Sequence, residues 1–202
     1  MSAIERIETS RLVLRPSSDE RDLATYLAHL TDPDEFFMQF GVRINDEVLR
    51  CVDFHSSGVV YYTVFSKALG AMVGYVGILP YEASDGVGEL EFHIFREQRG
   101  NGYCTEASEA LLGAYFDGSL TGKPGKKAVA ETMPENKATR KVLDKLGFER
   151  TSVGMAFLLS DEVEPDPHGC YSIEHYELDA TEFSLAAANA KAARREELPK
   201  AS

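Results

Sequence analysis

The chain lacks any long apolar segment and is poor in positive charge. No apolar run approaches the roughly 20 residues that a helix needs to cross a bilayer, and the first sixteen residues, MSAIERIETSRLVLRP, contain no continuous apolar core of a secretory signal. Lys and Arg number 21 against 33 Asp and Glu, which gives a formal net charge of -12. This balance argues against unaided binding to a nucleic-acid backbone, which requires clustered cations. It suits a cationic substrate better, or simply keeps the protein soluble.

Cysteine is also scarce. The three cysteines are Cys51, Cys104 and Cys170, an odd number whose spacings match no metal-binding or redox motif. We therefore expect free thiols in a reducing compartment, hence a cytoplasmic protein, and no metal site.

The apolar pattern predicts one α/β domain. Alternating and β-branched runs predict strands at residues 11–16, 59–66, 71–79, 88–95, 126–133, 151–160 and 171–179. Helical spacing predicts helices over 22–30 and 45–57, after Gly102, and over 135–148. This order indicates a mixed sheet flanked by helices. We expect a single domain over residues 8–183, followed by a charged, Ala-rich tail over 184–202.

The segment REQRGNGYCTEA, residues 96–107, joins a predicted strand to a predicted helix through two close glycines. Gly100 and Gly102 let the backbone approach a ligand, and the first turn of a helix presents unpaired N–H groups at its positive end. Such a loop favours an anion, usually a phosphate, and Arg99 would add a charge-assisted contact. A dinucleotide fingerprint needs a third glycine where Thr105 stands, and a P-loop ending is absent. A plain turn is the alternative.

The wider pattern resembles the GNAT superfamily of N-acetyltransferases. The run RGNGY, after an acidic strand and opening a helix, is similar to the acyl-CoA pyrophosphate loop of that family. Three further segments, ETSRLVLRP, GYCTEA and PENKATRKVLDKLGFE, resemble the branch that acetylates the N-terminal alanine or serine of ribosomal proteins (RimJ/RimL-like). Together they span roughly residues 8 to 180. The resemblance implies a single-domain GNAT fold with a mixed, mostly antiparallel sheet, splayed central strands and acetyl-CoA as co-substrate.

The resemblance also implies a set of acetyl-CoA contacts. The backbone of the strand before the loop would hydrogen-bond the pantetheine arm, and the N–H groups of the loop would hold the pyrophosphate. Asn136 stands where the family has an asparagine that contacts acetyl-CoA, although a helix N-cap is also in keeping with its position. The expected contacts are Phe92, His93, Ile94, Arg99, Gly100, Asn101, Gly102, Tyr103, Cys104, Thr105 and Asn136.

Cys104 departs from the family pattern, which has Gly or Ala at this position. A small thiol packs like a modest apolar side chain, so the loop is expected to form. A thiol at the start of a helix can gain thiolate character. A nucleophilic role would further require a base beside it.

Acetyl transfer to an amine requires a group that removes a proton from the ammonium. Glu89, Glu91 and His93 share one face of a regular strand. Glu89 stands where this superfamily often has a catalytic glutamate, and neighbouring like charges raise the pKa of one carboxyl group. The alternatives are a solvated or ion-paired acidic face, and a water relay without a single essential base.

The group that assists the leaving thiolate is less defined. Many GNAT enzymes have a tyrosine where Leu143 stands, so that acid is absent here. Thr139 stands where the ribosomal branch has a serine, and its hydroxyl is our candidate for a hydrogen bond to the thiolate sulfur. The alternative is an ordinary threonine on the helix surface.

The acceptor site is expected between the first two helices and the loop that joins the last two strands. This site is lined by Phe36, Phe37 and Phe40, unless these side chains pack internally. The acidic segment 161–166 either attracts an amine or is merely solvated. We predict base-assisted direct transfer of an acetyl group to a primary amine, of a protein N-terminus or a small molecule. No direct nucleic-acid or membrane partner is expected, and a homodimer is left open. The alternative function is a non-catalytic acyl-CoA-binding sensor or scaffold.

Overall fold

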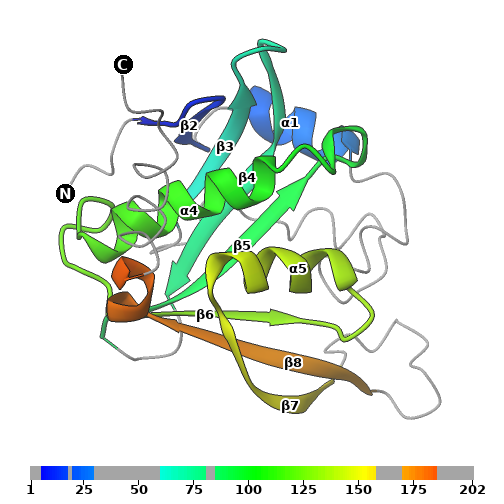
Figure 1. The fold of residues 1–202 in the computed structure, drawn as a ribbon. Coiled ribbons are helices and arrows are strands. Elements are labelled where there is room, and N and C mark those ends of the chain that lie inside the picture. The colour runs from blue at the N-terminus through cyan, green and yellow to red at the C-terminus, as the bar shows by residue number, and fades with distance from the viewer. Residues whose placement is uncertain (1–5, 18–19, 30–59, 81–84, 158–169, 186–202) are drawn as a thin grey trace, which may run out of the picture.

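An eight-stranded sheet forms the centre of the protein, here in a computed structural model that describes residues 6–17, 20–29, 60–80, 85–157 and 170–185 (Figure 1). The strands lie in the order β1-β2-β3-β4-β5-β6-β8-β7. They are β1 (Ile7–Glu8), β2 (Leu12–Pro16), β3 (Val60–Ser66), β4 (Ala71–Pro80), β5 (Val87–Ile94), β6 (Lys127–Thr132), β7 (Glu149–Phe157) and β8 (Cys170–Asp179). The helices are α1 (Glu20–His29), α4 (Tyr103–Phe116) and α5 (Lys137–Leu146), and a short 3-10 helix covers Arg96–Gln98.

The two central strands splay apart. Every neighbouring pair in the sheet is antiparallel except β5 and β6, which run parallel. β5 pairs with β4 along its length, from Gly88 to Ile94, but with β6 only from Val87 to Glu89. Beyond Glu89 the two strands diverge, as Figure 1 shows. The expected mixed, mostly antiparallel sheet with splayed central strands is therefore confirmed.

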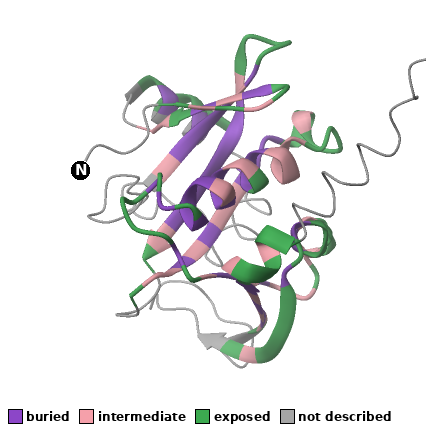
Figure 2. Ribbon diagram, turned by 60° about the vertical axis from the view of Figure 1, so that its left-hand side comes forward, coloured by how far each residue is buried: buried purple, intermediate pink, exposed green. Residues whose placement is uncertain are grey.

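The core lies between the sheet and the two helices α4 and α5, which cover the same face. Figure 2 shows buried residues along the central strands and on the inner side of α4. Leu111 of α4, Leu143 of α5 and Leu12 of β2 are each fully buried. Burying one such side chain contributes about 1.5–3 kcal/mol. Within each of these elements the apolar residues recur at helix or strand spacing, so the sequence pattern places the same faces inward.

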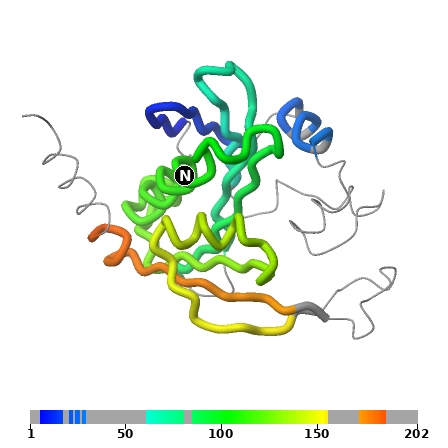
Figure 3. The backbone as a smooth tube through the Cα atoms, turned by 45° about the vertical axis from the view of Figure 1, so that its right-hand side comes forward, coloured from blue at the N-terminus to red at the C-terminus, as the bar shows by residue number. Residues whose placement is uncertain are grey.

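The opposite face of the sheet is covered at one end by α1 (Figure 3). Tyr26 packs edge-on against Tyr75 of β4, with ring centroids 4.8 Å apart. Asp22, which is 6% exposed, accepts hydrogen bonds from Arg15 at 2.7 Å and from Thr63 at 3.0 Å. These contacts fix α1 against β2, β3 and β4.

The predicted elements within the described residues are all present, with ends that differ by a few positions. β1 was not predicted, because two residues are too few to show a pattern. The predicted helix over 45–57, the three phenylalanines at 36, 37 and 40, and the segment 161–166 lie outside the described residues. Residues 180–185 form a helical turn, and the predicted limit between domain and tail at 183 stays a prediction. No helix in the described ranges is long and apolar enough to span a membrane.

Candidate active site

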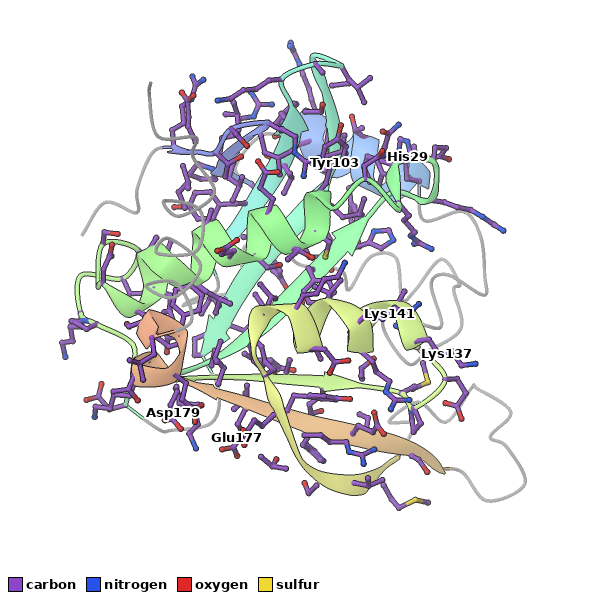
Figure 4. All side chains as sticks on the ribbon, in the orientation of Figure 1. His29, Tyr103, Lys137, Lys141, Glu177 and Asp179 are labelled. Atoms are coloured by element: carbon purple, nitrogen blue, oxygen red, sulfur yellow. The ribbon has the colours of Figure 1, made fainter. Side chains whose placement is uncertain are left out.

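A groove of about 600 Å³ opens where β5 and β6 part, between the end of β5, the start of α4 and one side of α5. Figure 4 shows Tyr103 at the start of α4 and Lys141 on α5. Among the residues that the structure describes, the side chains that line the groove include four cations, Arg96, Arg99, Lys141 and Lys145, and no Asp or Glu. In a chain of net charge -12, this composition marks the groove as a site for an anion.

Most of the predicted acetyl-CoA contacts meet in this groove. The lining residues are Phe92, His93, Ile94, Arg96, Gln98, Arg99, Gly100, Gly102, Tyr103, Cys104, Thr105, Asn136, Ala138, Thr139, Lys141, Val142 and Lys145. Asn101 is not among them: its side chain donates to the carbonyl of Gln98 at 3.0 Å and so shapes the turn. Of the α5 residues that line the groove, the sequence prediction named Thr139 and missed Ala138, Lys141, Val142 and Lys145. Their spacing from Ala138 to Lys145 marks one helical face and could have revealed them.

The two glycines of the loop have a backbone conformation that residues with a side chain rarely adopt. Gly100 has φ 80° and Gly102 has φ 76°, both in the left-handed region. A Cβ at Gly100 would meet no atom within 4 Å, and one at Gly102 only Nη2 of Arg11, at 3.4 Å. Gly102 is the N-cap of α4 and gives it no side-chain cap, so the first N–H groups of the helix remain for a ligand.

Arg99 is held in the groove by two contacts with β5. Its Nε donates to the carbonyl of Ile94 at 2.9 Å, and its Nη2 lies 3.2 Å from Nε2 of His93. Because a guanidinium only donates, Nε2 of His93 accepts and the ring proton resides on Nδ1. Burial, with the nearby charges of Arg99 and His29, lowers the pKa of His93 to about 3. His93 is therefore neutral with its accepting nitrogen engaged, which argues against its use as a base.

Glu89 lies at the last paired position before β5 and β6 part. Its side chain lies on the face opposite the α4 core, because side chains alternate along a strand. Burial, followed by the charges of Glu91 and Glu131, raises the pKa of Glu89 to about 7. Within the part of the chain described, its carboxylate has no hydrogen-bond or ion-pair partner. A carboxyl group with a pKa near neutrality has the property of a general base.

Glu91 shares the face of Glu89 but is engaged. Its carboxylate accepts a hydrogen bond of 2.7 Å from the hydroxyl of Tyr61. Burial raises the pKa of Glu91, while this hydrogen bond opposes the rise. Neither glutamate is among the residues that line the groove, so both lie beside the splay point on the other side of β5.

Asn136 and Thr139 line the groove together at the start of α5. Oδ1 of Asn136 accepts the backbone N–H of Thr139 at 3.1 Å and caps the helix. This leaves the amide NH₂ of Asn136 without a partner among the described residues. Leu143, at the position where many GNAT enzymes have tyrosine, is fully buried in the core. The helix therefore offers the groove a hydroxyl and an amide, and no phenol.

Cys104 lines the groove as a protonated thiol. Burial raises its pKa to about 12, against the opposing effects of Ser108 and Arg99. The position of Cys104 at the start of α4 suggested thiolate character. That expectation is wrong, since desolvation outweighs the helix dipole here. The residues that the structure describes contain no group of three His, Cys, Asp or Glu side chains that could hold a metal ion.

A mixed sheet that opens beside a glycine loop, with a cationic groove in the opening, defines an acyl-CoA-dependent acyltransferase fold. The chain belongs to the GNAT acetyltransferases, because the model of the acetyltransferase (GNAT) domain matches residues 11–149. The uncharacterised protein YkkB of Bacillus subtilis (strain 168) is 30% identical over 155 residues, which cover 73% of this chain and 87% of YkkB.

Solved structures show the same fold. A GNAT-family acetyltransferase from Bacillus anthracis is similar with a TM-score of 0.70 and 19% identity, over 88% of this chain and 99% of that one. RimL, a ribosomal L7/L12 alpha-N-protein acetyltransferase solved in complex with coenzyme A, has a TM-score of 0.64 and 13% identity, over 87% and 98%. The resemblance to the GNAT family is therefore confirmed, and its fold neighbours include ribosomal-protein acetyltransferases.

Proposed function

We propose that this protein transfers an acetyl group from acetyl-CoA to a primary amine, either of a protein N-terminus or of a small molecule. The observation that carries the proposal is the cationic groove at the splay of β5 and β6, which the described residues line without a carboxylate, with Glu89 beside its inner end. Family membership supports acetyl-CoA as the donor. The fold of a ribosomal L7/L12 acetyltransferase supports a protein N-terminus as one acceptor.

The residues of the groove fit acetyl-CoA, which supplies an activated thioester when bound. The pairing of β5 with β6 ends at Glu89, so the backbone of β5 from Phe92 to Ile94 can hydrogen-bond an extended pantetheine arm on that side. The N–H groups at the start of α4 and the guanidinium of Arg99 suit the pyrophosphate. The amide of Asn136 suits a carbonyl or hydroxyl of the same molecule.

Glu89 is our candidate for the general base. An amine must lose a proton before its lone pair can attack, and a carboxylate with a pKa of about 7 accepts that proton near neutral pH. Glu91 is the second candidate, although its hydrogen bond from Tyr61 occupies one oxygen. A water relay from either carboxylate is compatible with the same geometry.

Thr139 is our candidate for assisting the leaving thiolate. Its hydroxyl belongs to the groove wall, and its backbone is fixed by the cap at Asn136. A hydroxyl placed against the sulfur would donate a hydrogen bond to the developing negative charge.

The acceptor is expected to be cationic. Glu89 and Glu91 share one face of β5, and the charges of Glu91 and Glu131 both raise the pKa of Glu89. An ammonium group would relieve this repulsion on entering the site. A protonated N-terminal amine or a small polyamine meets this requirement.

A non-catalytic acyl-CoA-binding sensor is the second candidate. It is favoured by Leu143, which is fully buried where a tyrosine acid would otherwise stand. A thiol-release assay with N-terminal peptides, polyamines and aminoglycosides separates the two. Release of coenzyme A that depends on one acceptor class supports the enzyme. Tight acetyl-CoA binding without turnover on any amine supports the sensor, and absence of binding contradicts both.

A further inference from the structure

The segment ETSRL has no part in the proposed chemistry, yet it makes a dense set of contacts with α4. Thr9, Ser10 and Arg11 lie between β1 and β2 and converge on the carboxylate of Glu106, in the first turn of α4. These positions are about a hundred residues apart, with separations of 95 to 97. Two separate sequence motifs, ETSRL and GYCTEA, thus meet at one side chain.

Five donors saturate the carboxylate of Glu106. Oε1 accepts from the hydroxyl of Thr9 at 2.5 Å, the hydroxyl of Ser10 at 3.1 Å and the backbone N–H of Arg11 at 3.0 Å. Oε2 accepts from Nε and Nη2 of Arg11, each at 2.6 Å. The arrangement is a charge-assisted pair in which two guanidinium nitrogens share Oε2, while two hydroxyls and a backbone N–H occupy Oε1.

The remaining nitrogen of Arg11 contacts the glycine loop. Nη1 donates to the backbone carbonyl of Asn101 at 2.8 Å. The same guanidinium lies over the ring of Tyr103, 5.2 Å from its centroid. Arg11 therefore connects a fixed carboxylate in α4 to the peptide between the two left-handed glycines. Glycine has more backbone freedom than any other residue, so this loop has the most to lose on ordering.

The cluster is charged at neutral pH. Burial acts to raise the pKa of Glu106, but the hydrogen bonds from Thr9, Arg11 and Ser10 together outweigh burial and lower it. The pair therefore persists over the pH range in which an acetyltransferase works.

We propose that Thr9, Ser10, Arg11 and Glu106 form a clamp that holds the Gly100–Gly102 loop in the conformation that binds the donor pyrophosphate. The inference rests on the proposed function. None of the four residues lines the groove, so each is a positioning residue. A loop that is already ordered binds its ligand more tightly, because the ordering cost is met before binding.

Calorimetric titration of the full chain with acetyl-CoA tests the clamp. We expect Arg11→Ala to raise the Kd about 10-fold. Arg11→Lys keeps the charge, but its single ammonium group cannot replace the two contacts with Oε2 of Glu106 and the contact with Asn101, so we expect a similar loss. Arg6→Ala is the matched control: it removes the same charge from an exposed pair with Glu8 and leaves the Kd unchanged.

Hydrogen exchange in the ligand-free protein provides a readout that does not depend on acetyl-CoA. We expect the amides of residues 100–105 to exchange faster in Arg11→Ala and Glu106→Gln than in wild type, while protection of the β4 and β5 amides is retained. Wild-type affinity in Arg11→Ala and Arg11→Lys, or unchanged loop exchange, overturns the clamp while the proposed function stands. Absence of acetyl-CoA binding by the wild type overturns the proposed function and the inference with it.

Discussion

At the residue scale, the most informative side chain is Glu89. The alternation of GELEFHIF placed it on a common face with Glu91 and His93, and the structure keeps that face. Alternation could not show that the three side chains differ in their hydrogen-bond partners. Arg99 folds back from the following turn onto His93, and Tyr61 reaches Glu91 from β3, two strands away. These partners come from tertiary packing, which strand periodicity does not encode.

The pH dependence of turnover follows from Glu89. A base acts in its ionised form, and burial with the charges of Glu91 and Glu131 raises the pKa of Glu89 to about 7. We therefore expect kcat/KM to rise as pH increases through about 7 and then level off. Glu89→Gln should lower kcat about 100-fold and remove this inflection, with little change in the KM for acetyl-CoA.

Two controls belong to that measurement. His93→Gln retains an acceptor for Arg99 and should keep the inflection near pH 7. If the inflection in kcat/KM persists in Glu89→Gln and shifts in Glu91→Gln, the general base is Glu91 and not Glu89.

At the element scale, α5 was well predicted because its signals are local. Asn136 is the N-cap, as its position in the sequence indicated, and the helix ends at Leu146 with Gly147 as its C-cap. By contrast, the face that α5 turns to the groove depends on where β6 places the helix. Lys141 and Lys145 look like ordinary surface lysines in the sequence, and only the packing of α5 beside the splay makes them part of the site.

Asn136 combines a cap with a predicted contact, and two substitutions separate them. Asn136→Ala removes the cap and should lower the free energy of unfolding by about 1 kcal/mol, and it should also weaken acetyl-CoA binding. Asn136→Ser keeps a capping oxygen, so we expect wild-type stability with weakened binding. Denaturant unfolding and calorimetry give the two values. Wild-type affinity for acetyl-CoA in Asn136→Ser would mean that Asn136 only caps the helix.

The lysines of α5 allow a matched charge test. Lys141 lines the groove, whereas Lys137, one turn earlier on the same helix, does not. Lys141→Glu should raise the Kd for acetyl-CoA about 10-fold, with a smaller effect at high salt, because it places a like charge beside the phosphates. Lys137→Glu makes the same change in net charge and should alter the Kd less than about 2-fold. Equal effects of the two would mean that only the overall field matters.

At the scale of the whole molecule, the site is a product of topology. The parallel contact of β5 with β6 ends at Glu89, and this single interruption creates the groove, frees the edge of β5 and places Glu89 beside the opening. The sequence predicted the order of elements and, through the resemblance, the splay. It could not predict that an acidic chain would gather four cations around one opening, because two come from the turn after β5 and two from α5, about forty residues later.

The central claim is that this groove binds acetyl-CoA through the glycine loop, and calorimetric titration of Gly102→Val tests it most directly. Valine is strained at φ 76° and would place its side chain at the groove, so we expect the Kd to rise at least about 10-fold. Gly113→Val is the control, because Gly113 lies in α4, is not among the residues that line the groove, and a Cβ built there meets no atom of another described segment within 4 Å. We expect tight binding by wild type and Gly113→Val and weak binding by Gly102→Val. Equal affinity in all three would contradict the central claim.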